Sequence, residues 1–333
     1  SSDLVPKLLE EHGHEVYVIA GPHDIPSATT PGAFLNFGGT NIYKASQVEQ
    51  MGRLFTEGRV SKGDHFIFTD AWHPGIINLK YMSELLGIPV TIHALWHAGS
   101  YDPQDFLGRL IGDAPWVRHS EKAFFEAVDY NYFATDFHIN MFANNLYKAR
   151  ASDIKSKVVR TGWPMEYMLK TLLPYQHKPK RDLILFPHRI APEKQLEIFK
   201  CLAAAMPEYE FVVCQEHSLT KHAYHTLLSE AKMVFSANLQ ETLGISMYEG
   251  AVVGALPIVP DRLSYSEMYD ASYRYTSTWT DSFESFLHNE HMLVNYIRDR
   301  MKNYDQYAKK LLDQVKFLHD NFFSATKLLE HLR

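Results

Sequence analysis

The feature that most constrains this chain is an alternation of short apolar strands and helical segments that occurs twice. The first series has strand patterns at residues 65–70, 90–95, 131–135 and 158–164. The second series has them at residues 183–186, 210–214, 233–236 and 256–259. Strands spaced by helices are typical of parallel sheets with right-handed crossovers. The pattern therefore predicts an α/β protein with two doubly wound, Rossmann-like domains.

A Pro- and Lys-containing segment, residues 173–181, separates the two series. We therefore expect an N-terminal domain at residues 1–163 and a C-terminal domain at 164–305, with the tail from residue 282 almost wholly helical. Ligands of such sheets bind outside the carboxyl ends of the strands. The doubled pattern thus predicts two domains that face a cleft, with the site in that cleft.

Composition excludes several classes of protein. The 333 residues are 46% hydrophobic and 22% charged, which is unlike disordered, collagen-like or coiled-coil chains. The net charge of -6 gives no overall attraction to nucleic acid or anionic lipid. Cys201 and Cys214 are the two cysteines, too few for a disulfide framework or a zinc cluster. We expect a cytoplasmic protein without a membrane-spanning segment.

The segment after the strand at 233–236 carries two carboxylates around a helix start. Glu241 lies in the loop, Gly244 opens a helix, and Glu249 follows on that helix. The first N–H groups of a helix have no partner within it, so they form an anion site suited to a diphosphate. Glu249 could accept hydrogen bonds from a vicinal diol such as that of ribose.

The loop after the strand at 183–186 carries two cations, Arg189 and Lys194. Both would lie at the carboxyl edge of the same sheet, near the helix that begins at Gly244. Cations in that position can neutralise a diphosphate leaving group. The two loops together predict a phosphate-binding site in the C-terminal domain.

These two segments resemble the retaining glycosyltransferases of the GT-B fold, family four. Arg189 and Lys194 match the R-x4-K part of that family's G-R-x-x-P-E-K-G loop, and Glu241 and Glu249 match its E-x7-E motif. The likeness covers most of residues 183–270. It implies a nucleotide-sugar donor in the C-terminal domain, an acceptor held mainly by the N-terminal domain, transfer with retention, and no required metal or cofactor. It also implies that the last helical segment, 306–333, returns to the N-terminal domain.

The resemblance also implies individual roles. Arg189 and Lys194 would bind the diphosphate, Glu241 the hydroxyls of the transferred sugar, and Glu249 the ribose. The donor would also contact the loop and helix start at Thr242, Leu243, Gly244 and Ile245. Thr242 and Leu243 stand where the family usually has Gly-Phe, and we expect a UDP-sugar as the donor.

The N-terminal domain has polar and aromatic residues at two strand ends. The resemblance implies that His97 faces the donor sugar and the β-phosphate. Asp70 and His73 follow the preceding strand and are predicted to contact the acceptor. Trp96 and Tyr101 suit stacking against a sugar or base edge.

We expect front-face displacement, in which the departing phosphate takes the acceptor's proton. The acceptor is predicted to be polar and soluble, with a saccharide or small metabolite ahead of a hydroxymethylated pyrimidine of DNA, the acceptor of phage-type enzymes. The alternatives are a nucleotide-sugar epimerase or a phosphorylase of the same fold, and a non-catalytic binding module.

Two places suggest absent residues. The chain opens on a helical pattern at 4–11 before a strand pattern at 15–21, so a preceding strand is expected upstream of Ser1. The connection from Cys214 to His222 is shorter than in the family, so residues near position 217 are also expected to be missing.

Overall fold

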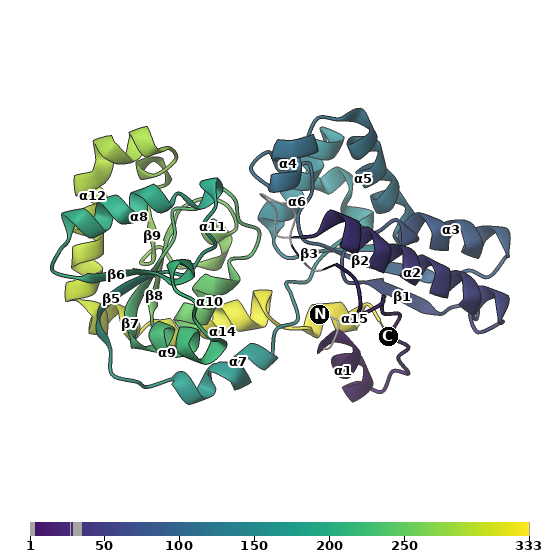
Figure 1. The fold of residues 1–333 in the computed structure, drawn as a ribbon, viewed down its shortest axis with the longest axis horizontal. Helices are drawn as coiled ribbons and strands as arrows, with labels where there is room; N and C mark the ends of the chain where they lie inside the picture. The colour runs from purple at the N-terminus through teal and green to yellow at the C-terminus, as the bar shows by residue number, and fades with distance from the viewer. Residues whose placement is uncertain (1–3, 27, 29–34, 333) are drawn as a thin grey trace. The chain divides into compact units, whose positions relative to one another are not determined.

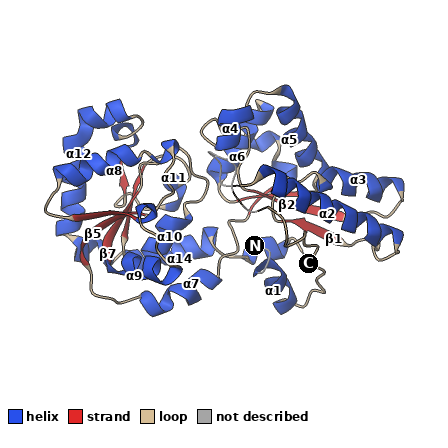
Figure 2. Ribbon diagram, viewed as in Figure 1, coloured by secondary structure: helices blue, strands red, loops and turns tan. Residues whose placement is uncertain are grey.

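The computed structural model describes residues 4–26, 28 and 35–332. The chain divides into two compact units, the first made of Ser1–Ala134, His138–Pro164 and Ala325–Arg333, and the second of Thr135–Phe137 and Met165–Ser324. Each unit contains one parallel sheet (Figures 1 and 2). The predicted pair of Rossmann-like α/β folds is therefore confirmed.

The sheet of the first unit has the order β1-β2-β3-β4. Its strands are β1 (His65–Phe68), β2 (Thr91–Trp96), β3 (Tyr130–Phe133) and β4 (Val158–Arg160). The α-helices of this unit are α1 (Leu4–Glu11), α2 (Phe37–Thr56), α3 (Gly75–Leu85), α4 (Phe106–Ile111), α5 (Pro115–Ala127), α15 (Thr326–Glu330) and α6 (Asp136–Phe142), whose first two residues fall in the second unit.

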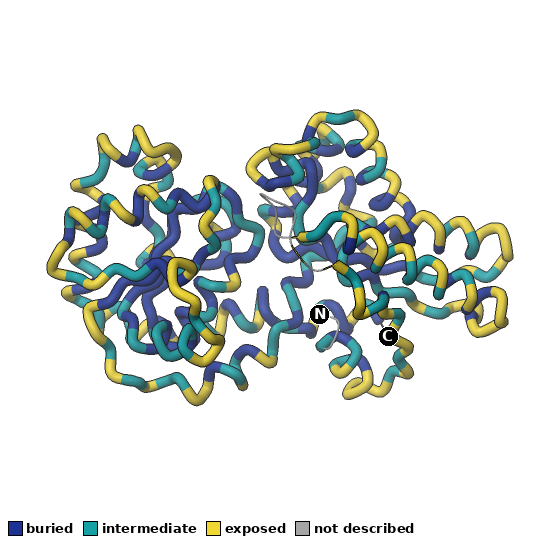
Figure 3. Tube along the Cα trace, viewed as in Figure 1, coloured by how far each residue is buried: buried dark blue, intermediate teal, exposed yellow. Residues whose placement is uncertain are grey.

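Both faces of this sheet are covered. On β2, Ala94 and Trp96 join a core with side chains of α2, α3 and α5, whereas Leu95 joins a separate core with α1 and α15. Successive side chains of a strand point to opposite faces, so one apolar run supplies both cores. The two central strands, β2 and β3, are accordingly among the buried segments of the trace (Figure 3).

The N-terminal segment differs from the prediction. Residues 15–21 form no strand, and Tyr17 and Val18 are exposed. Side-chain amides of α2 take the place of a neighbouring strand here: Gln47 donates to the Ile19 carbonyl and Gln50 to the Ala20 carbonyl, each at 2.7 Å. The alternating pattern at residues 15–21 thus corresponds to an irregular segment, whose Ile19 and Ala20 carbonyls bond to side chains of a helix and not to a neighbouring strand.

The sheet of the second unit has the order β6-β5-β7-β8-β9. Its strands are β5 (Arg181–Phe186), β6 (Glu210–Val213), β7 (Ala231–Phe235), β8 (Leu256–Pro260) and β9 (Arg274–Tyr275). Its α-helices are α7 (Tyr167–Leu172), α8 (Leu196–Ala205), α9 (Lys221–Glu230), α10 (Ile245–Val252), α11 (Tyr265–Met268), α12 (Phe283–Lys302), α13 (Tyr304–Ala308) and α14 (Leu311–Phe322).

The central strands of this sheet are buried on both faces. Residues 183–186 of β5 and 233–235 of β7 have no exposed surface. Helices α8 and α12 pack together against the sheet, and α10 packs with α7, α9 and α14 on the opposite side (Figure 1). Continuous apolar strands are what a parallel sheet between two helical layers requires.

The connection from β6 to α9 is short, and the absence of residues near position 217 stays a prediction. A single 3-10 turn (Cys214–Glu216) follows β6, and the Thr220 hydroxyl caps α9 by accepting from the Ala223 N–H at 3.1 Å. No helix in the described part of the chain is both long and apolar enough to cross a membrane.

Candidate active site

The second sheet has a topological switch point between β5 and β7. β5 is followed in sequence by β6 on one side, and the chain then crosses to β7 on the other side. The loops that leave the carboxyl ends of β5 and β7 therefore diverge, and ligands of doubly wound sheets bind in that crevice. The loop after β5 holds Arg189 and Lys194, and the loop after β7 holds Glu241.

Lys194 and Glu241 form a buried ion pair at this edge. The Lys194 Nζ lies 3.3 Å from Glu241 Oε2 and donates to the Gln240 carbonyl at 2.6 Å. The side chains are 7% and 19% exposed, respectively. Burial by itself would raise the pKa of Glu241, but Lys194, His188 and the N–H groups of Gly244 and Leu243 hold it below its usual value. Glu241 is therefore a carboxylate at neutral pH.

The start of α10 lies against this pair. Gly244 precedes the helix with φ of 76°, a left-handed conformation, and a Cβ there would come within 2.7 Å of the Tyr265 ring. Glu241 Oε1 accepts from the N–H groups of Thr242 and Leu243 at 3.1 and 3.3 Å. These two N–H groups, which were predicted to bind a phosphate, therefore donate to the Glu241 carboxylate instead.

Two side chains outside the predicted set hold the loop after β7. The Gln195 amide donates to the carbonyls of Ala237 and Thr280 at 2.6 and 2.7 Å. The Arg262 guanidinium donates to the carbonyls of Asn238, Ala237 and Thr280 at 2.7–3.0 Å. These bonds satisfy the buried carbonyls of the loop, so the position of Glu241 depends on residues that no motif indicated.

Arg189 lies on the other loop, in an ion pair with Glu193. The Glu193 carboxylate is fully buried, whereas the Arg189 side chain is 37% exposed. The Leu239 N–H donates to the Glu193 carbonyl at 2.8 Å, which joins the two loops. Arg189 is thereby anchored next to the segment that carries Lys194.

Glu249 does not contact the Lys194–Glu241 pair. Its Oε2 accepts from the Tyr224 hydroxyl at 3.1 Å, and its Oε1 lies 4.0 Å from His225 Nε2. Both partners belong to α9. The sequence placed the two carboxylates in one motif, but the structure gives Glu249 a separate environment between α9 and α10.

In the first unit, Asp70 and His97 follow neighbouring parallel strands. Asp70 Oδ2 lies 2.9 Å from Lys44 Nζ, a cation of α2 that the sequence analysis did not single out. His97 Nε2 bonds to the Thr69 carbonyl at 2.5 Å, and its ring centroid lies 3.7 Å from that of Trp163. Burial lowers the pKa of His97, while Asp70 opposes this shift.

Three predicted acceptor residues are instead part of the interior. Trp96 is fully buried, stacks on Phe133, and donates its indole N–H to Asn131 at 2.8 Å. Tyr101 is buried, with its hydroxyl 2.7 Å from His138 Nε2. His73 is also buried. Its Nδ1 accepts from the Gly75 N–H and its Nε2 bonds to Gln47, both at 2.9 Å. All three side chains are buried within the first unit, whereas the prediction expected them at its surface.

A buried carboxylate, Glu121 of α5, was missed by the sequence analysis. It accepts from the Ser100 N–H at 2.6 Å, from the Ser100 hydroxyl at 2.7 Å and from the Trp72 indole N–H at 3.0 Å. Ser100 lies in the loop after β2 and Trp72 in the loop after β1. Glu121 therefore ties together the two loops that carry His97 and Asp70. A mid-helix glutamate has no sequence signature for such a role.

We expect Glu121→Ala to destabilise the protein by about 3 kcal/mol, because buried donors left without partners cost about 1–3 kcal/mol each. Urea unfolding at pH 7 measures this change. Glu126→Ala on the same helix is the matched control, since that side chain is 59% exposed and its pair with Lys157 contributes at most about 1 kcal/mol. Equal losses in the two variants would contradict the role of Glu121.

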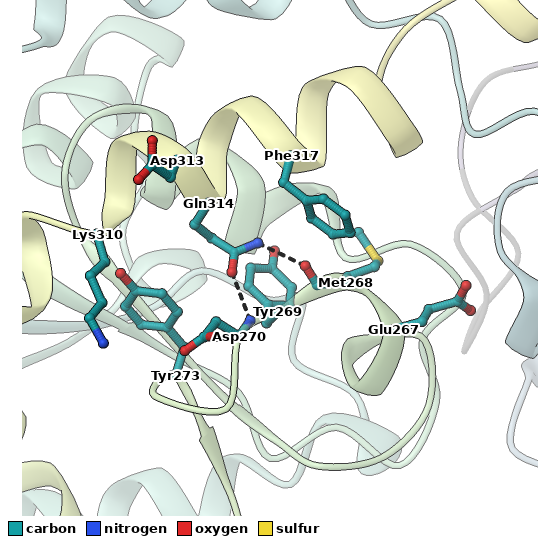
Figure 4. A pocket seen from close by; sticks show the side chains of 9 residues that line it. All are labelled: Glu267, Met268, Tyr269, Asp270, Tyr273, Lys310, Asp313, Gln314 and Phe317. Atoms are coloured by element: carbon teal, nitrogen blue, oxygen red, sulfur yellow. Dashed lines mark hydrogen bonds between the residues drawn. The ribbon is translucent and has the colours of Figure 1, made fainter.

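A pocket of about 580 Å³ lies elsewhere on the second unit (Figure 4). α14 supplies Gln314, whose side chain bonds the Asp270 N–H and the Met268 carbonyl at 2.7 and 2.8 Å. None of the predicted site residues lines it. Within the described ranges, no group of three or more His, Cys, Asp or Glu residues is arranged to hold a metal ion.

No protein-family model matches this chain, and no curated protein matches it in sequence. Solved structures do match. The sucrose-phosphate synthase from Thermosynechococcus elongatus aligns with 94% of this chain and 84% of its own at 11% identity, with a TM-score of 0.58. Anabaena HepE in complex with UDP and glucose aligns over 98% and 88% at 12% identity, with a TM-score of 0.56.

TarM gives a TM-score of 0.55 at 13% identity, covering 86% of this chain, which spans 57% of the length of TarM. The fold is of the GT-B type. The GT-B likeness covers both parallel sheets of the chain and includes the strands that place Lys194 and Glu241.

Proposed function

We propose that this chain is a retaining glycosyltransferase that moves a sugar from a nucleotide-diphosphate donor to a hydroxyl acceptor. The observation that carries the proposal is the buried Lys194–Glu241 pair at the switch point of a GT-B sheet. A buried ion pair is costly unless its groups are satisfied, and is seldom favoured over apolar residues for stability alone. The place of the pair at the switch point, where doubly wound sheets bind their ligands, supports a role in ligand binding.

The donor would bind over the second unit. Lys194 and Arg189 would neutralise the diphosphate with the N-terminus of α10, and Glu241 would accept hydrogen bonds from the transferred sugar. We infer that the donor is a UDP-sugar, which the structure of HepE in complex with UDP and glucose supports. The R-x4-K and E-x7-E resemblance to family four supports the same assignment.

Transfer would proceed by front-face displacement. The bond between the anomeric carbon and the phosphate oxygen breaks while the bond to the acceptor oxygen forms on the same face of the sugar. The acceptor proton passes to the departing phosphate. Lys194 and Arg189 stabilise the negative charge that grows on this phosphate, and no metal is needed for that step.

The acceptor is assigned to the first unit. Asp70, whose side chain is 44% exposed, offers carboxylate oxygens to a hydroxyl, and Lys44 keeps it ionised. Burial by itself would raise the pKa of Asp70, but the charge and hydrogen bond of Lys44, together with His97, hold it below its usual value. Because Trp96 and Tyr101 are interior, this acceptor is held by polar contacts. We infer a saccharide or a small polar metabolite.

The test incubates the protein with UDP-glucose, UDP-galactose and UDP-N-acetylglucosamine, each with and without a panel of saccharide acceptors. UDP release that depends on the acceptor, with a product of retained anomeric configuration by NMR, is the expected result. An inverted product would exclude the retaining mechanism. Conversion of the donor without an acceptor would indicate an epimerase, and salt-sensitive transfer to hydroxymethylated duplex DNA would identify a base acceptor instead.

A further inference from the structure

Tyr224 and Glu249 form a pair whose hydrogen-bonding pattern indicates what it can bind. Tyr224, on α9, donates its hydroxyl proton to Glu249 Oε2 at 3.1 Å. Having donated that proton, the phenol oxygen can only accept. Glu249 Oε1 is likewise an acceptor, and the Glu249 side chain retains 17% exposure. The pair thus offers a ligand two neighbouring acceptors and no donor.

The neighbouring groups do not change this pattern. His225 Nε2 lies 4.0 Å from Glu249 Oε1, beyond hydrogen-bond distance, and burial lowers the pKa of His225, so it is neutral at pH 7. Burial raises the pKa of Glu249, while the Tyr224 hydroxyl and Lys221 favour its ionised form. Without the Tyr224 hydroxyl, the Glu249 carboxylate would lose the hydrogen bond that holds one of its oxygens.

Two adjacent acceptors match two adjacent O–H donors. The 2′ and 3′ hydroxyls of a ribonucleotide are such a pair, and a 2′-deoxyribonucleotide presents only one of them. Sites built to bond a hydroxyl reject the analogue that lacks it, because a buried polar group is then left unpaired.

We propose that Tyr224 is a positioning residue that orients Glu249 and, together with it, selects ribonucleotide over 2′-deoxyribonucleotide donors. This inference rests on the proposed function, because it requires a nucleotide bound at the carboxyl edge of the second sheet. It adds a residue from α9, outside both sequence motifs, to the donor site.

The test measures the affinity of UDP and of 2′-deoxy-UDP by calorimetry for the wild type, Tyr224→Phe and Glu249→Gln. We expect the wild type to bind UDP at least about tenfold more tightly than 2′-deoxy-UDP, which is the contribution of about one hydrogen bond to the affinity. Tyr224→Phe should weaken UDP about tenfold and 2′-deoxy-UDP much less, so that the ratio falls towards one. Glu249→Gln, which keeps the Tyr224 side chain, should also lower the ratio.

Tyr175→Phe is the matched control. It removes a hydroxyl that bonds His222, on the same helix, at 2.7 Å, and does not contact Glu249. Its affinities and ratio should equal those of the wild type. A wild-type ratio retained in Tyr224→Phe and in Glu249→Gln would overturn the inference while leaving the proposed function intact. Absence of UDP binding by the wild type would overturn both.

Discussion

Lys194→Ala is expected to lower kcat for sugar transfer by about 10²–10³, with a smaller change in KM. Negative charge grows on the phosphate as the glycosidic bond breaks, so the loss of Lys194 affects the transition state more than the bound donor. Removing one preorganised group of this kind typically costs about 2.7–4 kcal/mol of transition-state stabilisation. Steady-state kinetics with saturating UDP-sugar measure the change.

Two further variants make this result interpretable. Lys200→Ala removes a cation of α8 whose pair with Glu216 is exposed, so its kcat should match that of the wild type. Lys194→Met keeps the apolar stem and tests whether Lys194→Ala is inactive through partial unfolding. Glu241 keeps its bonds to the N–H groups of Thr242 and Leu243 in each variant, which limits the loss of stability. A folded Lys194→Met protein with wild-type kcat would place the chemistry elsewhere.

On acidification from pH 7.5 to 5.5, four buried histidines are expected to remove about 5 kcal/mol of stability. Burial is the main cause that lowers the pKa of four histidines. The pKa is about 3 for His93, His138 and His188, and about 4 for His73. In the unfolded chain each takes up a proton near pH 6.5, so the unfolded state binds more protons below that pH. Stability is therefore complete above about pH 7.5 and falls by about 1.4 kcal/mol per histidine for each further pH unit below 6.5.

A total of about 5 kcal/mol is comparable to the whole stability of many domains. Burial raises the pKa of Glu121 and Glu249, and these two carboxyls act in the opposite direction, since they bind protons more tightly when folded. Urea titrations at pH 7.5, 6.5 and 5.5 measure the dependence. His93→Gln should reduce its slope by about one proton, and His291→Gln, at an exposed position of α12, should not. Identical slopes in the wild type and His93→Gln would contradict the assignment.

The candidate donor site could be predicted in part, because its residues follow strands that are recognisable from local sequence. The run at 183–186 is apolar and is followed by a proline, so the position of Arg189 and Lys194 after a strand end could be inferred. The pairing of Lys194 with Glu241 joins residues that are far apart in sequence. Only the strand order, which places β7 beside β5, brings them together.

The first unit shows why the acceptor residues could not be chosen in the same way. Strand β2 has apolar side chains on both faces, so its sequence does not reveal whether Trp96 faces a helix layer or solvent. The helices α2, α3 and α5 decide this by covering that face. Tyr101 and His73 follow strand ends, as catalytic residues do, yet both are buried with internal hydrogen-bond partners.

The sequence by itself determined the two α/β series, the parallel sheets and the loops that carry the charged residues. Strand and helix periodicities are local, so they can be recognised without knowing which elements pack together. Tertiary structure alone decided that Glu249 bonds Tyr224, that Glu121 joins two loops, and that Trp96 is interior. Those outcomes depend on which elements pack together. A side chain's hydrogen bonds and exposure are properties of the packed neighbours, which distant parts of the chain supply.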